Sequence, residues 1–207
     1  MSFGTAPKLS NKIIDGTHFT PTYIKFGIPF LRVTDIQREN INLNNVKRIS
    51  LEEHITLTKR CNPQKGDILY SKNGTIGITK LVDWDWKFSI FVSLCLIKVK
   101  SNIIYPIFLK YLLESDVIKK QISYRSKQMT VTNLHLEEIN EFQILFPKSI
   151  EMQKYISKIL KSIDNKISLE KSYLDKLQKI KKGLMQDLLT GKVRVTHLIK
   201  EEGTTHA

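Results

Sequence analysis

Asp15 and His18 are the first residues whose types and spacing could do chemistry, within the run Asp15–Pro21. Such a pair could move a proton, because histidine titrates near neutral pH and a carboxylate can orient its ring. An Asp-Gly dipeptide is also a common turn former, and a neighbouring histidine can simply be hydrogen-bonded there. This second interpretation is the commoner one, so we do not expect Asp15 and His18 to be catalytic.

Other catalytic signatures are missing from the sequence. The run Gly74–Gly77 does not have the spacing of the phosphate-binding loop GxxxxGK[ST]. No two prolines are adjacent, as an amino-directed DNA methyltransferase would need, and no proline precedes an aspartate, as a common metal-dependent nuclease motif would need. The histidines show no triad-like neighbourhood, although a triad is a spatial arrangement. We therefore expect a non-catalytic protein.

Cys61 and Cys95 are the only two cysteines. Neither belongs to a CxxC motif or has a histidine at ligand spacing, so we expect no metal, no cofactor, no disulfide framework and a reducing, cytoplasmic location. The longest apolar stretch, around Phe88–Val99, is interrupted by serines and is shorter than the roughly 20 residues of a membrane helix. The first ten residues lack the basic and apolar regions of a signal peptide, so we also expect no membrane contact.

Charge is the unusual property of the composition. Thirty-three lysines and arginines against 20 acidic residues give a net charge of +13 and a pI near 9.6. Such a balance is typical of proteins that meet phosphate backbones, but a solvated lysine-rich surface gives the same numbers. Composition leaves these two interpretations open.

The pattern of residues predicts an α+β fold, in which a single mixed α/β domain is followed by one long coiled-coil-forming helix. Between Leu9 and Pro147, short β-rich runs alternate with helical stretches and turn residues. We expect helices from a Ser50 cap to Lys59 and over 105–124. We expect a hairpin within 67–82 that turns at Asn73-Gly74, a buried strand over 90–99 and a last strand over 141–146.

After Pro147 the sequence predicts one helix to Leu189, about 60 Å long at 1.5 Å per residue. Alternating steps of four and three residues define a seam, which is apolar apart from Glu170 and Lys181. The seam consists of Ile156, Leu160, Ile163, Ile167, Glu170, Leu174, Leu177, Lys181, Leu184 and Leu188. No second segment of this chain is long enough to cover it, so the partner helix must come from another chain.

Glu170 and Lys181 allow two interpretations. In an antiparallel pairing of two copies, each glutamate could approach the lysine of the other copy and so fix the register. Both residues could equally lie at a frayed or partner-covered edge of the helix.

Several runs of sequence stand out in chain order: DGTHFTP (15–21), GIPFLR (27–32) leading to Asp35-Ile36, KGDILYSKNGTIG (65–77), LFP (145–147) with Glu151-Met152-Gln153, and GLMQDLLTGKVRV (183–195). In this order and spacing they resemble the specificity subunits of type I restriction-modification systems, almost from end to end. The Glu-Met-Gln run departs slightly from the more typical Glu-Gln pair.

The resemblance implies a DNA target-recognition domain over 1–148, a long helix for dimerisation and methyltransferase docking over 149–190, and a C-terminal tail over 191–207. It implies that the subunit reads one half of an interrupted double-stranded DNA target. A modification subunit would bind S-adenosylmethionine and methylate adenine, and a restriction subunit would supply ATP-driven translocation and cleavage.

Family members of usual length carry two recognition domains and two such helices, packed antiparallel, whereas this chain has one of each. It therefore resembles half a subunit, and the resemblance implies a homodimer that reads a symmetric site. A pairing with a different second half, a start that is truncated or part of a split gene, and the DNA target itself stay open.

Two groups of side chains are our candidates for DNA contact. The first is Lys72, Asn73, Thr75 and Lys80 on the hairpin, and the second is Arg125, Lys127, Gln128 and Thr130. Cationic side chains suit phosphates and amides suit adenine. The hairpin motif recurs in family members with different targets, so it could instead form the fold or bind the DNA backbone. We therefore favour residues 123–132 for sequence reading.

A second function class uses the same features. A free-standing dimeric, sequence-specific DNA-binding regulator would have the same basic domain and helical seam but would need no methyltransferase. A pure coiled-coil scaffold would leave the charge and the glycine-bearing motifs unexplained. We expect the specificity subunit.

Overall fold

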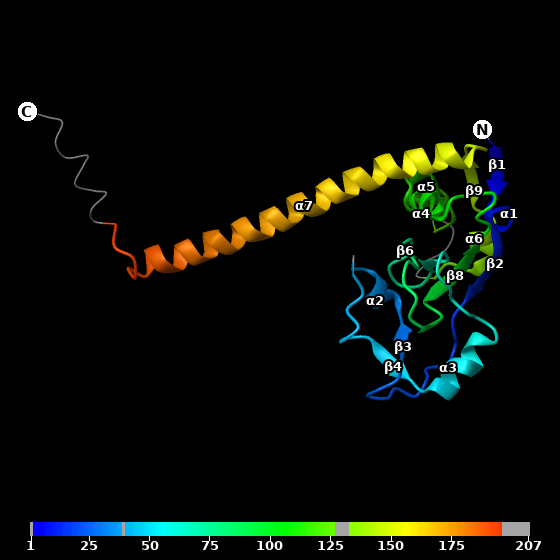
Figure 1. Cartoon of the computed structure of the whole chain (residues 1–207), viewed down its shortest axis with the longest axis horizontal. Helices are drawn as coiled ribbons and strands as arrows, with labels where there is room; N and C mark the ends of the chain where they lie inside the picture. Colours follow the sequence, from blue (N-terminus) through cyan, green and yellow to red (C-terminus); the bar gives the residue numbers. More distant parts are fainter. Residues whose placement is uncertain (1, 39, 127–132, 196–207) are drawn as a thin grey trace, which may run out of the picture. The chain divides into compact units, whose positions relative to one another are not determined.

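The computed structural model describes residues 2–38, 40–126 and 133–195 (Figure 1). Its chain divides into two compact units, Met1–Ser157 and Lys158–Ala207, and the division falls inside the last helix. The elements are β1 (Ser2–Thr5), α1 (Ala6–Leu9), β2 (Ser10–Asp15), β3 (Ile28–Leu31), α2 (Val33–Ile36), β4 (Lys47–Ile49), α3 (Leu51–Thr58), β5 (Ile68–Ser71), β6 (Thr79–Leu81), β7 (Ser89–Ile90), β8 (Leu94–Val99), α4 (Pro106–Glu114), α5 (Asp116–Ser126), α6 (Leu136–Asn140), β9 (Gln143–Phe146) and α7 (Ile150–Leu189).

Small sheets make up the β-structure of the first unit. Four antiparallel strands run in the order β2-β8-β5-β6, and β4-β3-β7 form a second sheet in which β3 and β7 are parallel. β1 and β9 form an antiparallel pair. The expected α+β fold, a mixed α/β domain followed by one long helix, is confirmed.

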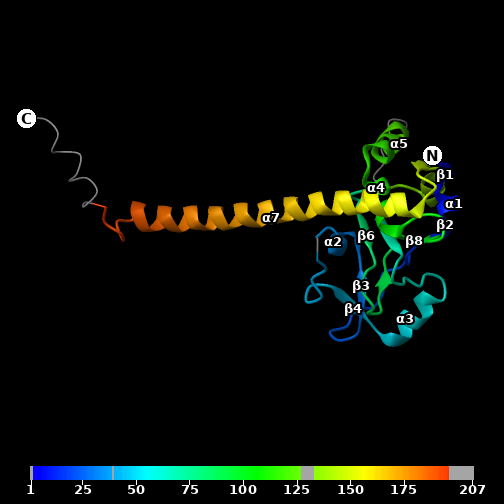
Figure 2. The same cartoon turned by 45° about the horizontal axis from the view of Figure 1, so that its top comes forward.

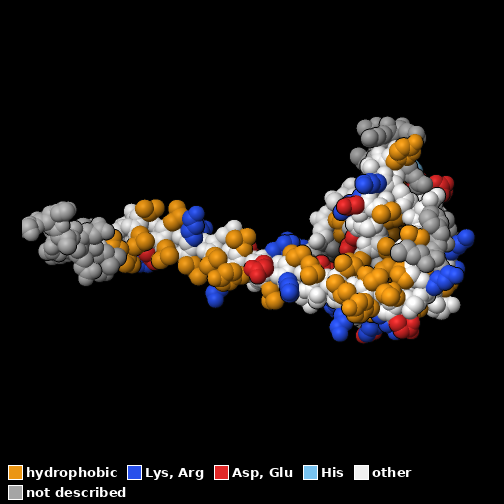
Figure 3. Space-filling view, turned by 90° about the horizontal axis from the view of Figure 1, so that it is seen from above, with side chains coloured by type: hydrophobic (Ala, Val, Ile, Leu, Met, Phe, Trp, Pro, Cys, Tyr) orange, Lys and Arg blue, Asp and Glu red, His pale blue; other side chains and the backbone are white. Residues whose placement is uncertain are grey.

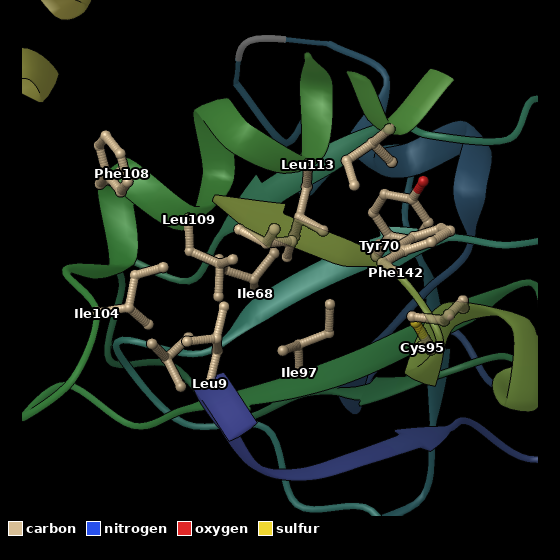
Figure 4. Packing of buried hydrophobic residues seen from close by; sticks show 14 of the residues in the cluster. Leu9, Ile68, Tyr70, Cys95, Ile97, Ile104, Phe108, Leu109, Leu113 and Phe142 are labelled. Carbon is tan, nitrogen blue, oxygen red and sulfur yellow. The ribbon is translucent and has the colours of Figure 1, made fainter. Parts of the chain in front are cut away.

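The four-stranded sheet is buried on both faces. Side chains alternate along a strand, so Ile68 and Tyr70 of β5 join one apolar cluster while Leu69 joins another. Figure 4 shows the first cluster, in which Ile68 and Ile97 lie near Leu109 and Leu113 of α4. A sheet covered on both faces holds the ends of its strands in place. The candidate site begins at two of these ends, where β2 ends at Asp15 and β5 ends at Ser71.

The hairpin prediction was right about the strands and wrong about the turn. β5 and β6 pair antiparallel, but residues 72–78 connect them in place of a two-residue turn at Asn73-Gly74. The loop folds around Ser71, whose hydroxyl donates to the Thr75 carbonyl and accepts from the Ile78 amide, both at 2.7 Å. Gly74 and Gly77 have φ angles of 72° and 91°, which suit glycine.

Two longer predicted elements are each interrupted. The expected strand over 90–99 is β7 and β8, which lie in different sheets, because a turn closed by the Leu94 amide and the Phe91 carbonyl separates them. The expected helix over 105–124 is α4 and α5, because the backbone of Ser115 between them is extended, with ψ 156°. The Ser115 hydroxyl donates to the Leu112 carbonyl and so helps to end α4.

Other predicted elements are confirmed. Ser50 caps α3 by accepting a hydrogen bond from the Glu53 amide at 3.1 Å, and β9 precedes Pro147 as expected. α7 spans the predicted range and ends before Gly191, which has a φ of 71°. Among the described residues, no helix combines the length and the apolar character that a membrane span requires.

The first turns of α7 are fixed to the domain by Gln153, which is fully buried. Its Oε1 accepts from the Tyr105 amide at 2.7 Å, and its Nε2 donates to the carbonyls of Ile103 and Pro147. The buried amide of Gln153 thus has partners for both its oxygen and its nitrogen, as a stable buried polar group requires. The helix therefore starts from a defined point of the first unit.

Candidate nucleic-acid interface

Asp15 is the centre of a cluster of charged side chains. Its carboxylate lies 2.5 Å from a guanidinium nitrogen of Arg60, 3.0 Å from Nε2 of His18 and 3.6 Å from Nζ of Lys72. Burial works to raise the pKa of Asp15, but the hydrogen bond from Arg60 and the neighbouring positive charges outweigh it, so the pKa lies below its ordinary value. The carboxylate is therefore ionised and bound to cations that hold three segments together.

This geometry suits a structural role for the Asp15–His18 pair. Arg60 also donates to the backbone carbonyls of Asp15 and Gly16, both at 3.0 Å, so the same guanidinium fixes the turn. A carboxylate paired with Arg60 and Lys72 is a poor base, because its charged form is already stabilised. The expectation that Asp15 and His18 form a turn rather than a catalytic pair fits these contacts.

A pocket of about 480 Å³ opens beside this cluster, and its lining includes Cys61 and Ser89. Cys61 lies in its wall, and burial raises the pKa of that thiol to about 11, so the thiolate is scarce near neutral pH. Ser89 is bonded to Nδ1 of His54 at 2.9 Å, and burial, followed by the charge of Lys87, lowers the pKa of that histidine. Ser89 and His54 are 1 % and 7 % exposed, so little of either side chain reaches the surface of the pocket.

Metal ligation is not supported by the geometry. In the part of the chain that the structure describes, no three His, Cys, Asp or Glu side chains gather closely enough to hold a metal ion. Cys61 and Cys95 are both free and buried.

The first predicted DNA-contact group is divided between the interior and the surface. Lys72 is 4 % exposed, and its ammonium faces Asp15 and, at 3.5 Å, Oδ1 of Asn73. Asn73 is half-buried, whereas Thr75 is exposed. Lys80 is half-buried and its Nζ donates to the carbonyl of Arg38 at 2.9 Å. Thr75 and Lys80 therefore reach the surface, while the charge of Lys72 is balanced inside the fold.

The second predicted group falls at and beyond the end of α5. Arg125 lies in the last turn of α5, and Lys127, Gln128 and Thr130 lie outside the described residues. The chain returns from this stretch to the first group, because Asn133 forms a β-bridge with Asn73 and the Leu134 amide donates to the Lys72 carbonyl at 2.7 Å. The segment that follows the second group is thus placed against the first.

Sequence reasoning missed two polar residues that contact the first group. Nε2 of Gln37 lies 3.5 Å from the Thr75 hydroxyl, and the Lys80 ammonium is bonded to the backbone of Arg38. Gln37 and Arg38 are exposed and follow directly after α2. A signal was present, because an amide and a guanidinium follow the Asp35-Ile36 motif, but nothing in the sequence shows that this segment lies beside residue 75.

The predicted seam of α7 is an exposed apolar stripe. Leu160, Ile163, Ile167, Leu174, Leu177, Leu184 and Leu188 are each between 38 % and 54 % exposed. Figure 3 shows apolar side chains gathered along the helix. Ile156 differs, because it is half-buried and packs against the core of the first unit. Ile159, Tyr173 and Ile180 widen the stripe on one side.

The structure thus defines a mixed α/β domain that continues into a long helix with an uncovered apolar stripe. Residues 10–179 match the family of the type I restriction modification DNA specificity domain. This match covers most of the chain, and the chain belongs to that family.

Individual relatives agree with this assignment. The chain is 28 % identical over 166 residues to the type I restriction enzyme EcoBI specificity subunit of Escherichia coli, covering 80 % of this chain and 35 % of the relative. It is 33 % identical over 140 residues to the MjaVIII specificity subunit of Methanocaldococcus jannaschii, covering 65 % and 33 %. The chain therefore spans about a third of the length of these relatives.

Solved structures show the same fold. The type I restriction-modification S subunit from M. genitalium aligns with a TM-score of 0.59 at 20 % identity, over 90 % of this chain and 45 % of that one. A chain from a structure describing complex assembly and conformational transition of the type I R-M system aligns with a TM-score of 0.69 at 16 % identity, over 94 % and 50 %. The chain spans about half of each.

Proposed function

We propose that this chain is a DNA sequence-specificity subunit of a type I restriction-modification system. In this proposal its first unit reads one half of an interrupted double-stranded target and positions a modification subunit, an adenine methyltransferase, together with a restriction subunit. The observation that carries it is the family match over 10–179, which includes both the recognition fold and most of α7. The net charge of +13 supports binding to DNA.

The chain itself would make and break no bond. This part of the proposal is supported by the burial of the His54–Ser89 pair and by the cationic partners that surround Asp15. The subunit would act in the cytoplasm, where the two free cysteines stay reduced.

We further propose that two copies pair antiparallel through α7. In one antiparallel register, the facing seam residues are Ile163 with Leu188, Ile167 with Leu184, Glu170 with Lys181, and Leu174 with Leu177. The two residue numbers in every pair add up to the same value, so a single register satisfies all of them. Each polar seam residue then meets the opposite charge, and each apolar one meets an apolar partner.

The positions that flank the seam support the same register. On one side of the seam, Lys166 faces Asp187 and Tyr173 faces Ile180 of the other copy. Opposite charges and paired apolar groups at flanking positions set partner choice and orientation in coiled coils. A parallel, in-register pair would instead bring Glu170 against Glu170 and Lys181 against Lys181, which repel each other.

A charge exchange on the seam tests the register. We expect Glu170→Lys and Lys181→Glu, each alone, to weaken the dimer, because each variant brings like charges together twice in a two-fold pair. The double variant restores opposite charges and should dimerise like the wild type. Sedimentation velocity over a concentration series measures this. A double variant as weak as the single variants would contradict the antiparallel register.

Methylation profiling tests the main proposal. The chain is expressed with the neighbouring modification gene, and the genome is compared with that of a cell that lacks only this chain. We expect a new methylated adenine motif that is palindromic and interrupted, because two copies of one domain read two identical half-sites. No new motif, although the two proteins co-purify, would contradict the homodimer. Loss of co-purification as well would contradict the specificity subunit and favour a free-standing regulator.

A further inference from the structure

α2 is a short but firmly anchored element. Ile36 is 2 % exposed and lies in the apolar cluster that includes Leu31 and Leu96. The Asp35 carboxylate accepts from the Arg32 amide at 2.8 Å and from the Arg32 guanidinium at 3.2 Å. The chain therefore leaves α2 in a fixed direction, which places Gln37 and Arg38 on the surface.

The segment after α2 is joined to the surface part of the predicted DNA-contact group. Gln37 contacts the Thr75 hydroxyl, and Lys80 of β6 donates to the Arg38 carbonyl. α2 and β6 lie side by side in both ribbon views (Figures 1 and 2). A polar pocket of about 210 Å³ opens beside Arg38 and is lined in part by Asn42 and Asn45. Amides and a guanidinium thus form one continuous polar surface.

We infer that Gln37 and Arg38 read base edges of the DNA target. Arginine can donate two hydrogen bonds to O6 and N7 of guanine, and glutamine can bond N6 and N7 of adenine. Both side chains are exposed and extend from an anchored turn, so they can be held in position before DNA binds. This inference rests on the proposed function, because it names the side chains with which the first unit would read its half-site.

Burial favours these two residues over their neighbours in the hairpin. Lys72 faces Asp15 inside the fold, and Asn73 is half-buried beside its bridge partner Asn133. A base edge can be reached only by side chains that extend from the surface. Thr75 and Lys80 reach that surface and flank Gln37 and Arg38, where a hydroxyl and an ammonium suit phosphate oxygens.

The test compares base preferences of the complete complex. The chain bound to its modification subunit is incubated with a random double-stranded DNA library, and the bound DNA is sequenced. Arg38→Ala and Gln37→Ala are expected to reduce the preference at one or two base positions by roughly 5- to 150-fold and to leave the others unchanged. Arg38→Lys should lose the same preference while keeping its charge, because lysine lacks the two-pronged donor.

Gln64→Ala and Lys65→Ala are matched controls, because they also change an exposed amide and an exposed cation. Both residues precede β5, whereas the 72–78 loop follows it. They should leave every position unchanged. Two results would overturn the inference: an unchanged motif in all three variants, or a uniform loss of affinity for all sequences with a smaller salt dependence, which indicates phosphate contact. If the wild-type complex enriches no motif at all, the proposed function fails first.

Discussion

Leu174→Ala is the substitution that tests the α7 pairing most directly. Leu174 is 53 % exposed in a single copy and faces Leu177 of the other copy in the proposed register. Fully burying a leucine side chain stabilises by about 1.5 to 3 kcal/mol, so covering the exposed half contributes about 1 kcal/mol per copy. The cavity that remains raises the loss to as much as about 2 kcal/mol per copy. A two-fold dimer contains the change twice, so about 2 to 4 kcal/mol is lost.

Such a loss weakens the dimer by roughly 30- to 700-fold, because about 1.4 kcal/mol corresponds to a factor of ten in the dissociation constant. Equilibrium sedimentation of the full chain measures this constant. Leu169→Ala is the control, since Leu169 is 70 % exposed but lies off the seam. Equal weakening by both substitutions would refute the seam, because it would show that α7 associates through any exposed apolar residue.

Three further predictions concern the first unit and the cysteines. Asp15→Asn should lower the free energy of unfolding by about 3 kcal/mol, measured by urea denaturation, because it leaves buried Lys72 without its anion. Folding lowers the pKa of Asp15, so the ionised carboxylate stabilises the fold fully above the unfolded pKa near 3.9. This stabilisation is lost as the pH falls below that value. The Asp15→Asn variant should therefore lose less stability than the wild type as the pH falls below about 4. Gln153→Ala should cost about 2 to 3 kcal/mol in thermal unfolding, whereas exposed Met152→Ala should change little; equal effects would contradict the anchor. Cys61 should resist iodoacetamide at pH 8 in the native protein and react in urea, since burial raises its pKa to about 11; rapid native alkylation would show that the thiol is accessible.

Elements with strong local signals could be predicted from the sequence. The Ser50 cap and the long helix α7 have local or periodic signals in the sequence, and both elements are confirmed. The breaks at residues 91–93 and at Ser115 could not be predicted in this way. The first break is imposed by tertiary structure, because an apolar run that reads as one strand serves two sheets. The second is local, because the Ser115 hydroxyl and amide both donate to the Leu112 carbonyl and so end α4.

The candidate site shows the same division at the level of side chains. Lysine, asparagine and threonine types at 72–75 indicate polar contacts, but the sequence does not show whether those contacts lie inside or outside the fold. Lys72 finds its anion in Asp15, which is distant in sequence, and only the pairing of β5 with β8 and of β8 with β2 brings them together. Gln37 was missed for the same reason, since its contact joins the segment after α2 to the loop between β5 and β6, 38 residues further along the chain.

The Asp15 cluster joins two of the sequence runs that stand out in the chain. Asp15 belongs to the run 15–21 and Lys72 to the run 65–77, and the two side chains face each other with about 5 % of each exposed. Loss of Asp15 leaves Lys72 as a buried charge without its anion, which is strongly destabilising, whereas loss of Lys72 leaves Asp15 paired with Arg60. Asp15 and Lys72 therefore hold segments of the first unit together. Gln37 and Arg38, by contrast, are exposed, so a substitution at either position leaves no buried charge behind.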